Sequence, residues 1–150
     1  MKHWQQRARA LELLSKEVGF VRKPHGGRLR VALAFPNTYF VGMSNLGFQT
    51  VYKLFNAEDD IVCERVFLPP KTELAEQLAS GAPLITLESQ TPVADFDVLA
   101  FSVSFEWDYT NVLTLLRLSE RGSWELGETL ESSAMLDNES SYENRSDSAP

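Results

Sequence analysis

The stretch LRVALAFPNTYFVGMSNLG, residues 29–47, decides the fold that we expect for this chain. It opens with the apolar run LRVALAF, which favours a strand buried on both faces and which the following Pro36 must end. A polar loop that contains Gly42 comes next. Ser44 or Asn45 can then cap a helix, because apolar residues recur at helical spacing after them. A strand, a ligand-sized loop and a helix in this order form the first half of a βαβ unit.

The rest of the chain repeats this alternation of strand and helix. Further apolar runs predict strands at residues 61–67, 84–87 and 98–103. Three more helices are expected. The first covers residues 3–18, and its apolar side is made by Trp4, Ala8, Leu11, Leu14 and Val18. The second is capped by Thr72 and ended by Gly81, and the third is capped by Asp108. We therefore predict a three-layer α/β fold with a parallel sheet of about four strands.

Composition divides the chain into three segments. Residues 1–21 are expected to form a basic amphipathic helix, residues 22–118 an α/β domain, and residues 119–150 an acidic, serine-rich tail that is disordered. The charge is uneven, because residues 1–30 contain eight Lys or Arg and two Asp or Glu, whereas the tail contains two and eight. The net charge of -7 and the acidic middle of the chain make nucleic acid an unfavourable partner.

Cysteine content and hydropathy exclude several classes of site. Cys63 is the only cysteine, so this chain alone builds no disulfide and no multi-cysteine zinc or iron–sulfur site. Because Cys63 lies in an apolar run, we interpret it as a small buried hydrophobe and not as a nucleophile. His3 and His25 are expected at the surface, not as metal ligands. The sequence has no apolar leader and no run long enough to span a membrane, which predicts a cytoplasmic protein.

Candidate binding residues gather after two of the predicted strands. No G-x-G-x-x-G turn follows the first strand and no Walker loop is present, so dinucleotide and nucleotide phosphate sites are not supported. Parallel strands share their carboxyl edge, where a planar or extended ligand would lie. The candidates at this edge are Asn37, Tyr39, Gly42, Ser44 and Asn45 after the first strand, and Ser104, Glu106, Tyr109 and Asn111 after the strand at 98–103. Helix capping and packing are the alternative roles for these residues.

Four segments carry a resemblance to a known family. They are FPNTYFVGMSNLGFQTVY at 35–52, VCERVFLPP at 62–70, LITLESQTP at 84–92 and DFDVLAFSVSFEWDYTNVLTLLRL at 95–118. Together they resemble the N-terminal cobalamin-binding-type domain of a family of bacterial radical S-adenosylmethionine (radical SAM) proteins. The resemblance implies a flavodoxin-like sheet and a following barrel that binds a four-iron cluster and S-adenosylmethionine for radical chemistry. We expect any corrinoid to lie at the candidate residues of the carboxyl edge, because both loops follow parallel strands that end there.

The chain departs from that family pattern in ways that change the expected function. The C-x-x-x-C-x-x-C cluster motif is absent, and so is the D-x-H-x-x-G loop that supplies a histidine to cobalt. The change of composition near Ser119 favours a truncated or frame-shifted gene product. We expect a fragment that has no catalytic activity alone, whose barrel is encoded separately or downstream, and whose incomplete sheet edge self-associates. The alternative is an α/β interaction module without a cofactor, which docks onto a partner protein through its basic first helix.

Overall fold

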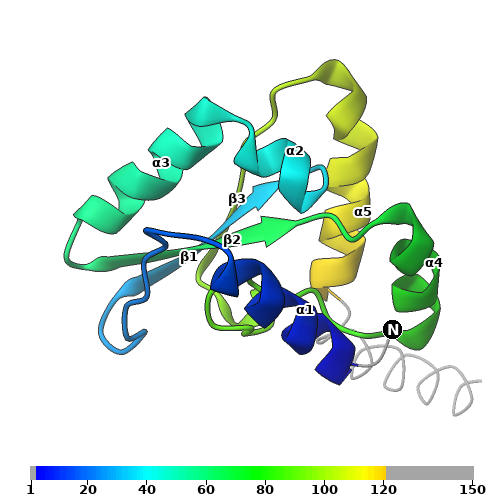
Figure 1. The fold of residues 1–150 in the computed structure, drawn as a ribbon, viewed down its shortest axis with the longest axis horizontal. Coiled ribbons are helices and arrows are strands. Elements are labelled where there is room, and N and C mark those ends of the chain that lie inside the picture. Colours follow the sequence, from blue (N-terminus) through cyan, green and yellow to red (C-terminus); the bar gives the residue numbers. More distant parts are fainter. Residues whose placement is uncertain (1–2, 121–150) are drawn as a thin grey trace, which may run out of the picture.

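The structure is a computed structural model that describes residues 3–120 (Figure 1). In chain order the elements are α1 (His3–Ser15), β1 (Leu29–Phe35), α2 (Tyr39–Met43), α3 (Leu46–Ala57), β2 (Ile61–Phe67), α4 (Lys71–Ser80), η1 (Val93–Asp95), β3 (Val98–Phe101), η2 (Glu106–Asp108) and α5 (Tyr109–Glu120). The predicted tail, residues 119–150, lies almost entirely outside the described residues.

A parallel sheet with strand order β2-β1-β3 forms the centre of the fold. Alternate side chains of β1 point to opposite faces, because successive residues of a strand alternate. Ala32 and Ala34 lie in a cluster with Leu115 and Leu118 of α5, with residues of α4 packed against it. Val31, Leu33 and Phe35 lie in a second cluster with Phe48 and Tyr52 of α3. The central position of β1 and its burial on both faces confirm the predicted α/β arrangement, which is compatible with a flavodoxin-like sheet.

The predicted strand at residues 84–87 does not form, so the described sheet has three strands. This segment makes one isolated antiparallel bridge, Ile85 to Pro92. It runs beside β2, where Leu87 N–H donates to the Arg65 carbonyl at 2.8 Å. Three further backbone groups at this edge are taken by side chains: Asn56 bonds both the N–H and the C=O of Cys63, and Glu88 Oε2 accepts from the Arg65 N–H. Because side chains occupy the edge of β2, a full strand cannot pair there.

The opposite end of the sheet is β3, which is shorter than the predicted strand at 98–103. Its four residues pair with β1 from Val98↔Val31 to Phe101↔Ala34. Within the part of the chain that the structure describes, β3 is the last strand of the order on this side. Self-association through this edge stays a prediction. No helix among residues 3–120 combines the length and the apolarity needed to cross a membrane.

The N-terminal helix differs from the prediction in its length and in its packing face. It ends at Ser15 and not at residue 18, and Gly19 follows with a φ of 85°. The predicted apolar side is largely exposed, because Trp4 and Leu11 keep 63% and 49% of their surface in solvent. Of the predicted side, Leu14 is buried, and it packs together with Ala10, which was not predicted, and Leu87. The basic helix is thus anchored to the domain by a neighbouring face.

The other helix starts were predicted with mixed success. Asn45 caps α3 as expected, since its Oδ1 accepts from the Phe48 N–H at 2.9 Å. Thr72 does not cap α4, whose N-cap is Pro70. The helix α2 was not predicted, because its five residues fall inside the segment that we interpreted as a loop.

Candidate functional site

The carboxyl ends of β1 and β3 form a topological switch point. After β1 the chain passes to α3 on one face of the sheet, whereas after β3 it passes to α5 on the other face (Figure 1). Ligands of open α/β sheets bind where neighbouring strands diverge in this way. We call residues 36–45 and 102–111 the switch-point loops. They contain all nine residues predicted from the sequence as a binding site.

Hydrogen bonds from three asparagine side chains join the two switch-point loops. Three asparagine amides donate across them: Asn45 Nδ2 to Ser104 Oγ at 2.9 Å, Asn37 Nδ2 to Asp108 Oδ1 at 3.2 Å, and Asn111 Nδ2 to the Pro36 carbonyl at 2.9 Å. The structure thus brings together four of the predicted residues, namely Asn37, Asn45, Ser104 and Asn111. These bonds fix the two loops to each other.

Asp108 is a residue of this region that the sequence prediction interpreted only as a helix cap. Its side chain is buried, with 3% of the residue exposed. Oδ1 accepts the bond from Asn37, but Oδ2 is buried and has no hydrogen-bond partner among the described residues. A carboxylate oxygen in that position is costly, because it has lost water and gained no donor. Asp108 Oδ2 is therefore a buried acceptor that lacks a donor among the described residues.

Three other predicted residues have contacts within the domain, and their role in ligand binding stays a prediction. A Cβ on Gly42 would lie 2.5 Å from Phe67 Cε1, so this glycine makes room for a ring. Ser44 Oγ donates to the carbonyl of Phe40, one helical turn back. Tyr39 donates its hydroxyl to Glu17 Oε1 at 2.7 Å, and burial followed by Glu17 raises its pKa to about 12.

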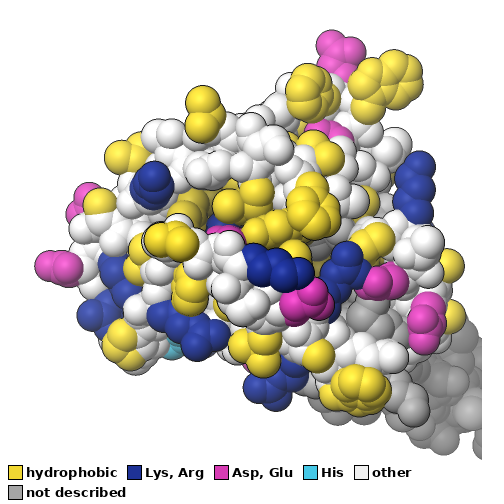
Figure 2. Space-filling model, viewed as in Figure 1, with side chains coloured by type: hydrophobic (Ala, Val, Ile, Leu, Met, Phe, Trp, Pro, Cys, Tyr) yellow, Lys and Arg dark blue, Asp and Glu magenta, His cyan; other side chains and the backbone are white. Residues whose placement is uncertain are grey.

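The remaining predicted residues, Glu106 and Tyr109, lie at the surface beside exposed apolar side chains. Tyr109, Phe105 and Trp107 keep 64%, 61% and 89% of their surface in solvent. Figure 2 shows hydrophobic side chains projecting at the upper right of the molecule, where Figure 1 places the start of α5. Aromatic residues exposed to this degree are typical of contact surfaces for ligands or partners.

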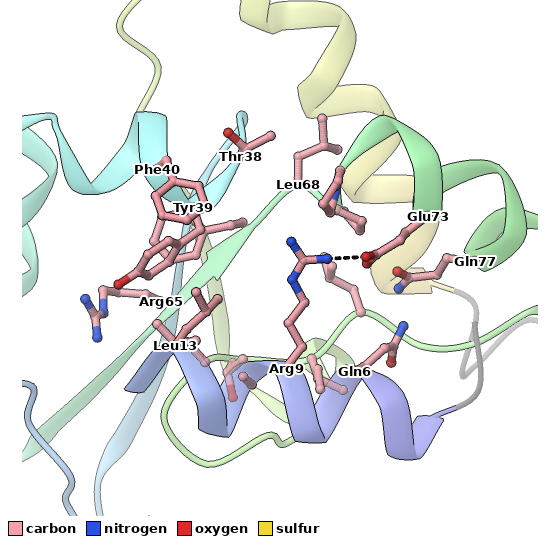
Figure 3. Close-up of a pocket in the computed structure, with 18 residues that line it drawn as sticks. Gln6, Arg9, Leu13, Thr38, Tyr39, Phe40, Arg65, Leu68, Glu73 and Gln77 are labelled. Carbon is pink, nitrogen blue, oxygen red and sulfur yellow. Dashed lines mark hydrogen bonds and ion pairs between the residues drawn. The ribbon is translucent and has the colours of Figure 1, made fainter. Parts of the chain in front are cut away.

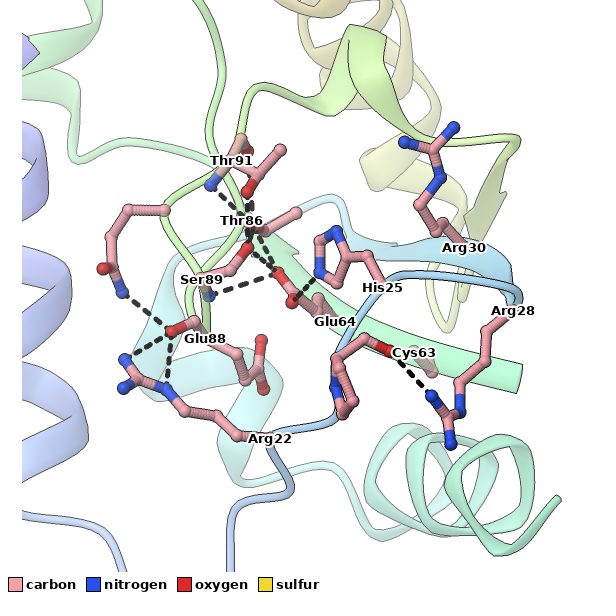
Figure 4. Close-up of polar contacts among 12 residues, drawn as sticks. Arg22, His25, Arg28, Arg30, Cys63, Glu64, Thr86, Glu88, Ser89 and Thr91 are labelled. Carbon is pink, nitrogen blue, oxygen red and sulfur yellow. Dashed lines mark hydrogen bonds and ion pairs between the residues drawn. The ribbon is translucent and has the colours of Figure 1, made fainter. Parts of the chain in front are cut away.

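A buried polar network that was not predicted from the sequence lies around β2, at the edge of the sheet opposite β3. Glu64 accepts from Thr86 Oγ1 and Ser89 Oγ, each at 2.6 Å, and contacts His25 Nε2 at 2.7 Å (Figure 4). His25 also packs edge-to-face on Phe96. His25, expected at the surface, is half-buried against Glu64, because folding brings the linker before β1 against β2. Residues 3–120 contain no group of three or more His, Cys, Asp or Glu that could hold a metal.

A second part of this network is centred on Arg65. Its Nε donates to Glu88 Oε1 at 2.6 Å and its second terminal nitrogen donates to Glu17 Oε2 at 2.8 Å. Burial raises the pKa of Glu88, and the N–H groups of Arg65 oppose this rise. Arg22 donates to the Glu88 backbone carbonyl (Figure 4). The hydrogen bonds of this network all join residues of the domain to one another, which indicates a structural role. Its signal in the sequence was the pair Glu64 and Arg65 within a strand predicted to be buried.

Cys63 is buried, and burial followed by Glu88 raises the pKa of its thiol to about 12. We expect the native protein to resist a thiol reagent such as Ellman's reagent at about pH 8, since only the thiolate reacts. Cys63 is the only cysteine, so the labelling measures one site. Protein unfolded in guanidinium should react at once and provides the control. Rapid stoichiometric labelling of the native protein would contradict this structural role.

Comparison with known proteins gives one match. Residues 47–123, just over half of the 150-residue chain, match a family model described as "Radical SAM proteins, N-terminal". The chain belongs to this family. The radical SAM relationship predicted from the sequence is thereby confirmed. The region matched to the radical SAM N-terminal family runs from the start of α3 past α5 and includes the second switch-point loop. No curated protein and no solved structure matches the chain.

Proposed function

We propose that this radical SAM N-terminal domain is of the cobalamin-binding type and holds a corrinoid against its switch-point loops, without catalytic activity of its own. The family membership supports this proposal, and so does the strand order β2-β1-β3, which is the order at a flavodoxin-like ligand site. The observation that carries it is the buried acceptor Asp108 Oδ2 at that switch point. Buried polar groups normally have a hydrogen-bond partner, and a donor from a bound molecule would supply one here.

The residues at this edge fit the periphery of a corrinoid. The macrocycle carries amide side chains whose N–H groups could satisfy Asp108 Oδ2, and its apolar faces suit the exposed rings of Phe105, Trp107 and Tyr109. No histidine belongs to the switch-point loops, and His25 contacts Glu64 elsewhere. The chain would therefore bind the corrinoid without a protein ligand to cobalt. A bound corrinoid supplies cobalt-based group transfer; this chain's residues bind and orient it.

Radical chemistry would need a partner segment. A radical SAM cluster requires three cysteine thiolates, and Cys63 is the only cysteine in this sequence. We propose that the cluster and the S-adenosylmethionine are held by a barrel outside this sequence, which docks over the aromatic side chains beside the switch-point loops. The domain would present the corrinoid to that barrel. Orientation of this kind lowers a reaction barrier by removing translational and rotational freedom beforehand.

Tryptophan fluorescence tests the proposal, because corrinoids absorb light in the range of tryptophan emission and quench nearby rings. The chain has three tryptophans, Trp4, Trp107 and Trp124. One variant keeps only Trp107 (Trp4→Phe, Trp124→Phe) and a matched variant keeps only Trp4 (Trp107→Phe, Trp124→Phe). Titration with hydroxocobalamin should quench the Trp107 protein saturably and more strongly than the Trp4 protein, since Trp107 lies in a switch-point loop and Trp4 on α1.

The role of Asp108 is tested in the Trp107 protein. Asp108→Asn keeps the shape but removes the anionic acceptor, so we expect the affinity for hydroxocobalamin to fall about tenfold or more. Asp95→Asn, at an exposed position before β3, is the control and should leave the affinity unchanged. Failure of hydroxocobalamin to quench Trp107 saturably would overturn the proposal. The alternative, a docking module without a cofactor, would then explain the exposed aromatic side chains.

A further inference from the structure

α1 packs against the domain with one face and leaves the opposite face in solvent. Ala10 and Leu14 of the inner face are buried, and Arg9 forms an ion pair with Glu73 of α4 (Figure 3). Between this inner face and the carboxyl ends of β1 and β2 lies a cavity of about 350 Å³. The space remains because the chain leaves β1 toward α3 on one face of the sheet and leaves β2 toward α4 on the other. The inner face is thus the one that holds α1 to the domain.

The outer face of α1 carries an apolar row beside a basic side chain. Trp4, Ala8 and Leu11 are all exposed, and their spacings of four and three residues place them on one side of the helix. Arg7 lies next to this row, three residues after Trp4 and four before Leu11. It takes part in no ion pair among the described residues. A segment that is both apolar and acidic would complement this face.

The sequence that follows α5 has this composition. Residues 123–131, SWELGETLE, contain Trp124, Leu126 and Leu130 together with three glutamates, and they contain no Lys or Arg. These residues lie outside the part of the chain that the structure describes. Their apolar side chains match the row on α1, and their negative charge is opposite to that of Arg7.

The chain enters this segment close to α1. Near the end of α5, the Leu118 carbonyl accepts from the Leu84 N–H at 3.3 Å, and Leu84 lines the cavity under α1 together with Gln6. In Figure 1 the end of α5 points toward the N-terminal half of α1. The four residues from Glu120 to Trp124 can span about 14 Å when extended. Because α1 is only about 20 Å long, the following residues can reach its outer face.

We propose that residues 124–130 pack on the outer face of α1, with their leucines against Trp4 and Leu11 and their glutamates near Arg7. Burial of apolar surface drives this contact, and the opposite charges fix its position. A segment of the same chain is favoured over a separate partner, because tethering gives it an effective concentration of about millimolar. The contact occupies the helix through which the alternative function would dock onto a partner protein.

Acrylamide quenching of Trp4 measures whether this face is covered. The Trp4 protein of the hydroxocobalamin titration keeps an aromatic ring in the tail, so it retains the proposed contact. Leu126→Ser combined with Leu130→Ser removes the apolar contacts. We then expect the quenching constant of Trp4 to rise about twofold, because the indole becomes accessible to the quencher. Met135→Ser combined with Leu136→Ser makes the same kind of change further along the tail and should leave the constant unchanged.

A charge reversal tests the other side of the contact. Arg7→Glu should raise the quenching constant of Trp4 in the same direction, because the glutamates of the tail are then repelled from the apolar row. Lys53→Glu, at an exposed position on α3, is the matched control and should have no effect. Circular dichroism of every variant reports whether the domain is folded.

Three results overturn the inference. The first is a quenching constant that stays unchanged in the double leucine variant or in Arg7→Glu. The second is a Trp4 that acrylamide quenches as strongly in the native protein as in guanidinium. The third is a constant that depends on protein concentration, because a second copy of the chain would then cover the face. None of the substituted residues belongs to the switch-point loops, so these results are independent of hydroxocobalamin binding.

Discussion

Arg65→Met should lower the free energy of unfolding by about 3–5 kcal/mol, because it leaves the Glu88 carboxylate buried without its cation. The side chains of Arg65 and Glu88 are only 3% and 0% exposed. The same substitution also removes the ion pair with Glu17 and the packing of the guanidinium over the Tyr52 ring. Equilibrium unfolding in urea, followed by circular dichroism, measures the change.

Arg30→Met is the matched control for this experiment. Arg30 forms an ion pair with Asp97 at 2.8 Å, but the two side chains are 35% and 39% exposed. Exposed ion pairs contribute about 0–1 kcal/mol, so the control should lose little stability. Equal losses in Arg65→Met and Arg30→Met would contradict the structural role of the buried network.

The pH dependence of the Arg65→Met variant provides a second readout. Burial raises the pKa of Glu88, and without Arg65 the main opposing interaction is lost. A carboxyl whose pKa is higher in the folded state binds more protons when folded, so folding becomes more favourable as the pH falls. The stability difference between Arg65→Met and the unaltered protein should therefore be smaller at about pH 5 than at about pH 7.5. A difference that grows toward low pH would show that Glu88 is not the group left unpaired.

Gly42→Val should destabilise the domain by about 1–3 kcal/mol through overpacking. A Cβ at this position would lie 2.5 Å from Phe67 Cε1 and 3.2 Å from Phe35 Cδ1, and both rings are held in the core beneath α2. Thermal unfolding measures the effect. Gly26→Val is the control, because a Cβ there meets nothing within 4 Å.

This outcome would separate two roles for Gly42. As a candidate binding residue, Gly42 would let a ligand approach the backbone, and the substitution would then weaken binding and leave stability unchanged. The structure assigns the space to Phe67. Equal melting temperatures of Gly42→Val and Gly26→Val would therefore restore the first interpretation.

The switch-point site was accessible to sequence reasoning only in part. Asn37 and Ser104 could be assigned to one edge because parallel strands share their carboxyl ends, and their bonds to Asp108 and Asn45 follow from that proximity. Tyr39 could not be placed, because its hydroxyl meets Glu17, a residue that is distant in sequence and brought close by the packing of α1. The unpartnered Oδ2 of Asp108 could not be predicted either, since a helix-capping aspartate and a buried aspartate look alike in sequence.

Local pattern alone determined the strands β1 and β2, the cap at Asn45 and the burial of Cys63, because each depends on neighbours within a few residues. Only the tertiary structure decided what lies beside them. The edge of β2 is occupied by the side chains of Asn56 and Glu88, so residues 84–87 remain outside the sheet. Likewise, the cavity under α1 exists because two chain crossovers diverge. Such features depend on the packing of elements far apart in sequence, which periodicity and propensity do not encode.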